Sequence, residues 1–165
     1  MSVVSNTGPL IALAKADHLG LLKALFGVVL IPQAVQRELL SKSGGEAQRL
    51  DEAMSTFVQV APVGEMAGQL LEMLENLGAG EQQAIALAAG SGALLIIDER
   101  LGRNAARRAG VQVSGTVGVL IEAKLRGLIT EVLPVLQGIR QSGYWLSDEL
   151  VRAALELAGE SFPTE

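Results

Sequence analysis

The sequence contains no cysteine and a single histidine, and these shortages exclude several kinds of site. Without cysteine the chain can form neither a disulfide nor a thiolate metal site, and it suits a reducing cytoplasm, where we expect the protein to act. One histidine, His18, cannot supply the several imidazoles of a multi-histidine zinc site. The glycine patterns of dinucleotide-binding and phosphate-binding loops are also missing. The sequence therefore points away from thiolate, multi-histidine and nucleotide-loop chemistry.

Long apolar runs and an excess of positive charge are absent as well. No apolar run approaches the ~20 residues that a membrane span requires, and the N-terminus lacks the basic and apolar regions of a secretory signal. The formal net charge is −5 and the pI is about 5.0. Such acidity argues against non-specific binding to a polyanion, but it leaves room for RNA binding through a local basic patch. We therefore expect no membrane partner.

What the sequence has in plenty is aliphatic residues in short runs. Hydrophobic residues make up 49% of the 165 positions and aromatic residues only 3%, which suits helices packed on a buried sheet. Alternation of apolar runs with longer helical stretches predicts an α/β fold, with a mostly parallel sheet covered on both faces, in one domain. The predicted strands are 3–5, 28–31, 57–60, 94–97 and 111–113. The predicted helices include 9–25, 33–42, 65–77, 81–90, 100–109, 117–126 and 147–158.

Two polar residues follow predicted strands, at the sheet edge where open α/β folds place their ligands. Asp98 ends the most apolar strand, in the stretch "LLIIDER", and Asn6 follows the first strand, in "VVSNTGP". Each has a structural alternative, because Asp98 also suits capping of the next helix and Asn6 also suits a turn. Capping and a functional role are compatible for Asp98, since a carboxylate has two oxygens.

Two glutamates are candidates because of their positions on predicted helices. Glu81 follows the glycines of "LGAGEQQ", at a helix start where interaction with the helix dipole alone is worth about 0.3–1 kcal/mol. Glu38 lies at the edge of an apolar stripe, from which it can point across the top of the sheet. Its structural alternative is an ion pair with Lys42, four residues on, worth about 0.2–0.5 kcal/mol. Taken singly, each glutamate fits either role.

Basic and aromatic residues in the last third of the chain also have two interpretations. Arg100, Arg103 and Arg107 share one helix face, which is either solvated or a phosphate-contacting strip beside the aspartate that ends the strand. Tyr144 and Trp145 suit packing of the last helix against the core or a partner better than stacking on a base. Neither group is decisive by itself.

Together, these segments resemble the PIN domain, a family of metal-dependent nucleases that includes the toxins of VapC-type toxin–antitoxin pairs. The likeness is closest to an uncharacterised prokaryotic branch of that family, and it spans almost the whole chain. The order and spacing of the segments carry the resemblance more than any single motif does. The matching stretches are "VVSNTGPLIALAK", "IPQAVQREL", "LGAGEQQAIALA", "LLIIDERLGRNAARRAGVQVSGTVGVLIEAKLRGLI" and "YWLSDELVRAALELAGE".

The resemblance implies a fold, an activity and a site. The implied fold is a three-layer α/β/α sandwich with a mostly parallel five-stranded sheet of order 3-2-1-4-5, as one domain over 1–165 with a C-terminal helical extension at 144–165. The implied activity is hydrolysis of single-stranded RNA by an endoribonuclease that uses Mg²⁺ or Mn²⁺, and the implied protein partners are an antitoxin and a second copy of the chain. The implied catalytic residues are Glu38, Glu81 and Asp98. The implied metal ligands are Asn6, Glu38, Glu81, Asp98 and Glu99, and the implied nucleic-acid contacts are Arg100, Arg103 and Arg107.

The chain departs from the family pattern at Asn6, where the first acid usually stands. An amide oxygen is still a legitimate ligand for a hard cation, but it brings no charge. Two unit charges about 4 Å apart interact by about 4 kcal/mol at an effective dielectric of about 20, so the missing charge weakens metal binding. Glu99, beside Asp98, can restore part of the field. The alternative function is therefore a catalytically inactive PIN-like module that binds RNA or a partner protein.

Overall fold

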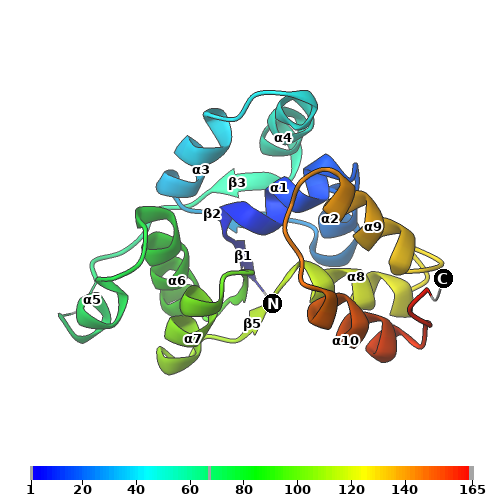
Figure 1. Cartoon of the computed structure of the whole chain (residues 1–165). Coiled ribbons are helices and arrows are strands. Elements are labelled where there is room, and N and C mark those ends of the chain that lie inside the picture. Colours follow the sequence, from blue (N-terminus) through cyan, green and yellow to red (C-terminus); the bar gives the residue numbers. More distant parts are fainter. Residues whose placement is uncertain (1, 67, 164–165) are drawn as a thin grey trace.

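The computed structural model describes residues 2–66 and 68–163 of the chain (Figure 1). Its centre is a five-stranded sheet in the order β3-β2-β1-β4-β5, and all neighbouring strands in it are parallel. The α/β class and the strand order are those predicted above. The strands are β1 (Val3–Ser5), β2 (Val29–Ile31), β3 (Val58–Val60), β4 (Leu94–Ile96) and β5 (Val113–Ser114).

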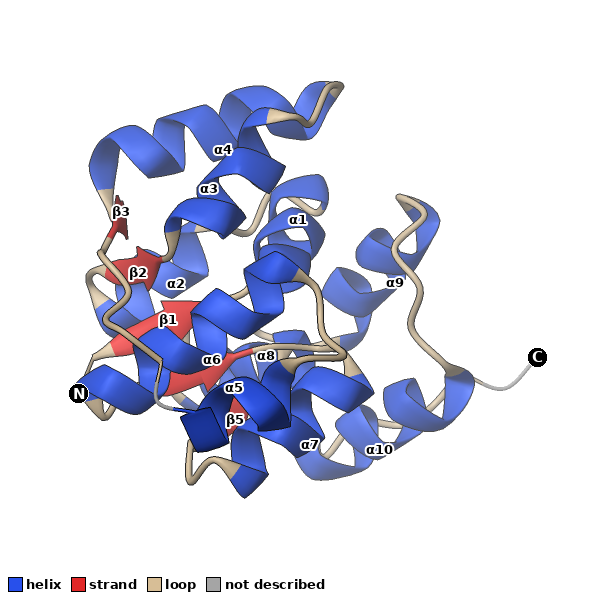
Figure 2. Cartoon of the chain, turned by 90° about the vertical axis from the view of Figure 1, so that its left-hand side faces the viewer, coloured by secondary structure: helices blue, strands red, loops and turns tan. Residues whose placement is uncertain are grey.

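Helices cover both faces of the sheet, so the molecule has three layers (Figure 2). Parallel strands require such helical crossovers, because the chain must return across the sheet before it can run in the same direction again. One face carries α5 (Gly68–Leu74), α6 (Ala79–Ser91) and α7 (Arg100–Arg108). The other carries α1 (Thr7–Lys15), α2 (Gly20–Phe26), α3 (Gln33–Leu40), α4 (Gly45–Thr56), α8 (Thr116–Leu125), α9 (Leu133–Gln141) and α10 (Asp148–Ala158).

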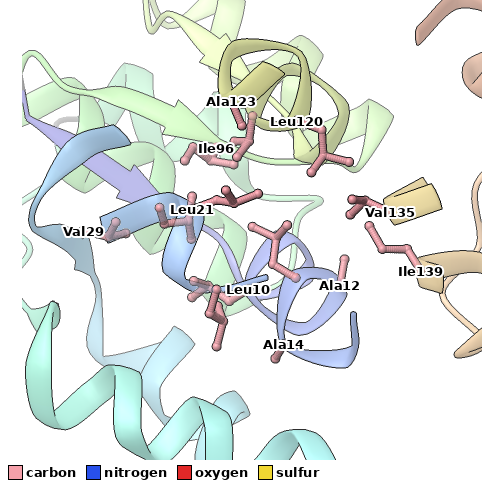
Figure 3. Close-up of a cluster of buried hydrophobic side chains, with 14 of the residues drawn as sticks. Leu10, Ala12, Ala14, Leu21, Val29, Ile96, Leu120, Ala123, Val135 and Ile139 are labelled. Carbon is pink, nitrogen blue, oxygen red and sulfur yellow. The ribbon is translucent and has the colours of Figure 1, made fainter. Parts of the chain in front are cut away.

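Alternation along the strands divides the interior into two cores. Val3 and Ile96 point to one face, and Val4, Leu95 and Ile97 point to the other, because successive side chains of a strand alternate. In the larger core, side chains of α1, α8 and α9 face one another across the interior (Figure 3). The two central strands therefore lie between two apolar layers, which explains their nearly continuous apolar sequence.

The structure shows that the prediction of one helix over 9–25 is wrong. The first helix ends at Lys15 and the second begins at Gly20. Between them Asp17 adopts a left-handed backbone conformation, with φ 57°, which interrupts the helical path. Aspartate tolerates this conformation better than most residues because its short polar side chain can hydrogen-bond locally. Both helices still contribute buried leucines to the larger core.

Other elements differ from the prediction in extent. Helices α4 and α9 lie outside the predicted segments, since α4 buries only Leu50 and Ala53 and α9 contains Gly138, which lowers helix propensity. Within the helix predicted at 65–77, the structure describes α5 over Gly68–Leu74, and position 67 lies outside the described residues. The last strand is β5, later than the predicted 111–113.

The C-terminal part of the chain packs on the helices that cover the larger core. Helix α10 lies against α8, and Leu146, Val151 and Leu155 enter the larger core. Ser147 Oγ accepts a hydrogen bond from the Leu150 N–H at 3.1 Å, so it caps α10 as the sequence predicts. No helix within the described ranges has the length and apolar character needed to cross a membrane.

Candidate active site

Asn6 and Asp98 lie at the carboxyl edge of the two central strands. Strand β1 pairs with β4 so that Ser5 is opposite Ile96, and the Asn6 backbone N–H donates to the Ile96 carbonyl at 2.9 Å. Asn6 directly follows β1, and Asp98 follows β4 by two residues. The pairing of the two strands therefore delivers both side chains to the same edge of the sheet.

The side chain of Asn6 does not serve the helix that follows it. Asn6 occupies the N-cap position of α1, but no capping hydrogen bond is made by its side chain, which is nearly buried. Thr7 has a buried hydroxyl oxygen with no hydrogen-bond partner among the described residues. Such an orphaned group costs about 1–3 kcal/mol, so it calls for an explanation such as an ion or water. A turn role alone does not account for this pair of residues.

A pocket of about 240 Å³ lies at this edge of the sheet. One amide and four carboxylate side chains, from four parts of the chain, line it: Asn6, Glu38, Glu81, Asp98 and Glu99. Thr7, Gly8, Ile11 and Tyr144 form the rest of its wall. The structure thus brings together all the residues that the family resemblance implied as metal ligands. Their role as ligands stays a prediction.

Helix α3 carries Glu38 to the pocket because it is fixed against α6. The Ala34 backbone N–H donates to Gln83 Oε1 at 3.0 Å, which satisfies one of the free N–H groups at the start of α3. A Cβ at Gly80 would overlap the Glu38 carboxylate, so glycine permits this close approach of the two helices. Within the described ranges Glu38 forms no ion pair with Lys42. The ion-pair alternative for Glu38 is therefore wrong.

The pocket concentrates negative charge around Glu81. This residue lies in the first turn of α6, and its pKa is raised from 4.5 to about 7. Partial burial is the largest cause, repulsion from Glu99 is the next, and Glu38 adds to it. No salt bridge in the described part of the chain neutralises these carboxylates. The crowding of acidic groups therefore disfavours the ionised form of Glu81.

Asp98 accepts three hydrogen bonds. Thr116 donates its backbone N–H to Oδ1 at 2.8 Å and its hydroxyl to Oδ2 at 2.6 Å, and the Tyr144 hydroxyl donates to Oδ2 at 2.5 Å. Burial, together with the Asp98 carboxylate, raises the pKa of Tyr144 above its ordinary value, so the phenol stays a donor. The N-cap of α7 is Glu99, so the alternative that Asp98 caps this helix is wrong.

The three arginines do not lie together on the pocket wall. Arg103 is half-buried, donates to the Ile97 carbonyl at 2.7 Å and lines a neighbouring groove of about 630 Å³. Arg100 and Arg107 are exposed on the same helix. Trp145 lines the same groove and is 82% exposed, so it does not pack against the core, and its contact with a partner stays a prediction. The proposed phosphate-contacting strip stays a prediction, with Arg103 nearest the acidic residues.

The oxygen atoms around the pocket are of the kind that a hard divalent cation prefers. Carboxylate and amide oxygens are ligands that Mg²⁺ and Mn²⁺ prefer, and Glu38, Glu81, Asp98, Glu99 and Asn6 supply them around the pocket. Among the described residues, no three acidic, histidine or cysteine side chains form a group able to hold a metal ion. The residues therefore fit the cation in chemistry, and Mg²⁺ is usually held by only one or two carboxylates together with waters.

Comparison with known proteins identifies the family. Residues 2–160 match the PIN-domain family DUF3368, which is almost the whole chain. The chain is a PIN domain of this family. PIN domains generally have a nuclease fold and use divalent metal ions.

The solved structures that resemble this PIN domain include a PilT N-terminus domain protein from the hyperthermophilic archaeon Sulfolobus solfataricus P2. The two are 17% identical with a TM-score of 0.48, and the match covers 89% of this chain and 98% of that one. No curated protein matches the chain. The family assignment therefore depends on the match over residues 2–160.

Three polar residues at the site of this PIN domain were not among the predicted site residues. Thr116 had a usable signal, because it follows β5, the neighbour of β4, at the same carboxyl edge as Asp98. Gln83 also had a usable signal, because it is a polar residue directly before the apolar part of α6. Tyr144 had none, because it lies in a loop 46 residues from its partner. Only the tertiary structure reveals that contact.

Proposed function

We propose that this PIN domain is a metal-dependent endoribonuclease that hydrolyses phosphodiester bonds of single-stranded RNA, with Mg²⁺ or Mn²⁺ as its cofactor. The observation that supports it best is the convergence of four carboxylates and the Asn6 amide on one pocket at the carboxyl edge of the central strands. A nuclease fold with such an oxygen-rich pocket is suited to phosphodiester hydrolysis. The amide of Asn6 attenuates this activity, because it supplies an oxygen without a charge.

Glu38, Glu81 and Asp98 are the proposed carboxylate ligands, and Asn6 and Glu99 complete the set. A cation bound there supplies an activated water and neutralises charge on the scissile phosphate. The chain contributes by holding its oxygens on packed elements, since α3 is tied to α6 through Gln83. The repulsion that raises the pKa of Glu81 supports the proposal, because a divalent cation would relieve it.

Arg103 is the proposed first contact for an RNA phosphate. It lines the groove that adjoins the pocket, and Asp98 and Glu99 belong to the walls of both. A guanidinium suits a phosphate because it offers several donors in a fixed plane. Arg100 and Arg107 are exposed on the same helix and are proposed to contact further phosphates of the RNA. The net charge of −5 confines RNA binding to this local patch.

The second candidate is an inactive module that binds RNA or a protein, and Asn6 is the residue that favours it. An amide at this position removes one of the charges that would attract a cation. The lack of a group of three metal-binding side chains among the described residues favours the same candidate. The two functions differ in what Asn6→Asp should do. Asn6→Asp should raise RNA cleavage if the protein is an attenuated nuclease. The same substitution should produce no cleavage if the protein is an inactive module.

Cleavage of a fluorescently labelled single-stranded RNA, over titrations of Mg²⁺ and Mn²⁺, tests the proposed function. We expect slow metal-dependent cleavage by the wild type, faster cleavage by Asn6→Asp and none by Asp98→Ala. Glu156→Ala is the matched control, because it removes an exposed carboxylate from α10 and should cleave like the wild type. If neither the wild type nor Asn6→Asp cleaves at any metal concentration, the inactive module is the better conclusion.

The family resemblance also supports partner proposals. The chain would then act in the cytoplasm with an antitoxin protein and as a homodimer. Light scattering of the purified protein measures the oligomeric state directly. Co-expression with the product of a small adjacent gene tests for an antitoxin, which should suppress RNA cleavage.

A further inference from the structure

The loop between α9 and α10 reaches back into the acidic pocket. It carries the only tyrosine and the only tryptophan of the chain, Tyr144 and Trp145. The Tyr144 ring packs at the margin of the larger core, and its hydroxyl reaches Asp98 Oδ2. A Cβ on Gly8 would lie 3.0 Å from this hydroxyl, so the absence of a side chain at Gly8 makes room for it. Tyr144 thus connects α1, the end of β4 and the loop before α10.

Two residues donate the hydrogen bonds that Asp98 accepts: Thr116 at the start of α8, and Tyr144 in the loop before α10. Thr116 is fully buried and lines neither the pocket nor the groove. Its backbone N–H and its hydroxyl therefore donate to the two carboxylate oxygens from the protein interior. This two-point contact already fixes the plane of the carboxylate. Tyr144 lines both the pocket and the neighbouring groove, and its hydroxyl donates to Oδ2. A carboxylate oxygen has about two acceptor positions, and Thr116 and Tyr144 fill both on Oδ2.

We propose that Tyr144 acts as a latch on Asp98: its hydroxyl occupies an acceptor position of Oδ2 and must leave before a divalent cation can bind that oxygen. This inference rests on the proposed metal site. Cation binding is then coupled to a movement of the loop that carries Tyr144.

The coupling has a definite direction. A cation that binds only the unlatched state draws the population toward that state, and its apparent affinity is reduced by the small fraction of molecules that are unlatched. A hydrogen bond from a hydroxyl to a carboxylate is among the stronger ones in proteins. Removal of the Tyr144 hydroxyl should therefore raise the affinity for Mg²⁺ about tenfold. A merely structural role of Tyr144 predicts lower stability with unchanged affinity.

Trp145 provides a direct optical report, because it is the only tryptophan and neighbours the latch. We would titrate the full chain with Mg²⁺ and record both calorimetric binding and Trp145 emission, after thermal melts have shown that each variant is folded. Tyr144→Phe keeps the ring and removes the hydroxyl. Ser147→Ala is the matched control, because it removes the N-cap hydrogen bond of α10 in the same loop but does not touch Asp98.

We expect the wild type to bind Mg²⁺ with a change in Trp145 emission. Tyr144→Phe should bind about tenfold more tightly with a smaller emission change, and Ser147→Ala should match the wild type. Equal or weaker Mg²⁺ binding by Tyr144→Phe would overturn the latch and leave the proposed metal site standing. No binding by either protein would overturn both proposals. Unchanged Mg²⁺ affinity in Asp98→Ala would show that Asp98 is not a ligand and would also overturn the latch.

Discussion

Replacement of Glu81 by glutamine should make the stability of the metal-free protein less dependent on pH. In the folded wild type, burial and repulsion from Glu99 raise the pKa of Glu81 from 4.5 to about 7. The folded chain therefore binds this proton more tightly than the unfolded chain does. The resulting stabilisation is fully present below about pH 4.5 and is lost as the pH rises toward 7. Glutamine has a similar shape and does not ionise, so Glu81→Gln lacks this loss.

The size of the effect follows from the pKa and the exposure of the side chain. The difference between 4.5 and about 7 corresponds to about 3 kcal/mol for a fully buried group. Glu81 is only partly buried, so screening by water reduces this value, and we expect about 1 kcal/mol. For a domain of this length, that free energy moves the melting temperature by about 2–4 °C.

Urea denaturation in EDTA at pH 4.5 and pH 7 measures this effect. Between the two pH values the wild type should lose about 1 kcal/mol more unfolding free energy than Glu81→Gln. Glu72→Gln, on the exposed side of α5, is the matched control and should follow the wild type. Addition of Mg²⁺ at pH 7 should stabilise the wild type more than Glu81→Gln. An identical pH dependence of wild type and Glu81→Gln would refute the reasoning from burial and repulsion.

Other contacts give further expected outcomes. Asn6→Asp adds a negative charge to the pocket, so the variant should melt at a lower temperature than the wild type when no metal is present. Mn²⁺ should raise the melting temperature of the variant more than that of the wild type, and equal shifts in the two proteins would contradict this. Gly80→Ala places a Cβ against the Glu38 carboxylate and should lower Mg²⁺ affinity in calorimetry by about tenfold, whereas unchanged affinity would remove Glu38 from the ligand set. Glu160→Gln weakens contacts with Lys124 and with two N–H groups at the start of α9, so urea denaturation should show a loss of about 1–3 kcal/mol, and an unchanged midpoint would assign these contacts no net stability.

The two central strands were predictable because they are buried on both faces. A strand in that position is apolar at nearly every residue, so the runs at 3–5 and 94–97 stand out from their surroundings. The order of the strands came from the family resemblance, since runs of apolar residues do not specify which strands pair. The break at Asp17 was not predictable from periodicity, because apolar residues continue on both sides of it.

The candidate site was predictable to the extent that it follows from strand ends and helix starts. Asn6 and Asp98 follow the two central strands, so one rule about parallel sheets brings them together. The contact between Tyr144 and Asp98 depends instead on how a loop folds back over the sheet, which no local pattern records. The spacing of the carboxylates depends on the same tertiary contacts, and the sequence gives no measure of it.

The central claim is that a divalent cation binds between Glu38, Glu81 and Asp98. Diffraction from crystals soaked in Mn²⁺ and recorded at the manganese absorption edge tests this claim most directly. We predict an anomalous peak in the pocket at the carboxyl edge of β1 and β4, about 2 Å from carboxylate oxygens of these residues. An anomalous peak at another place on the molecule, or none at saturating Mn²⁺, would contradict it.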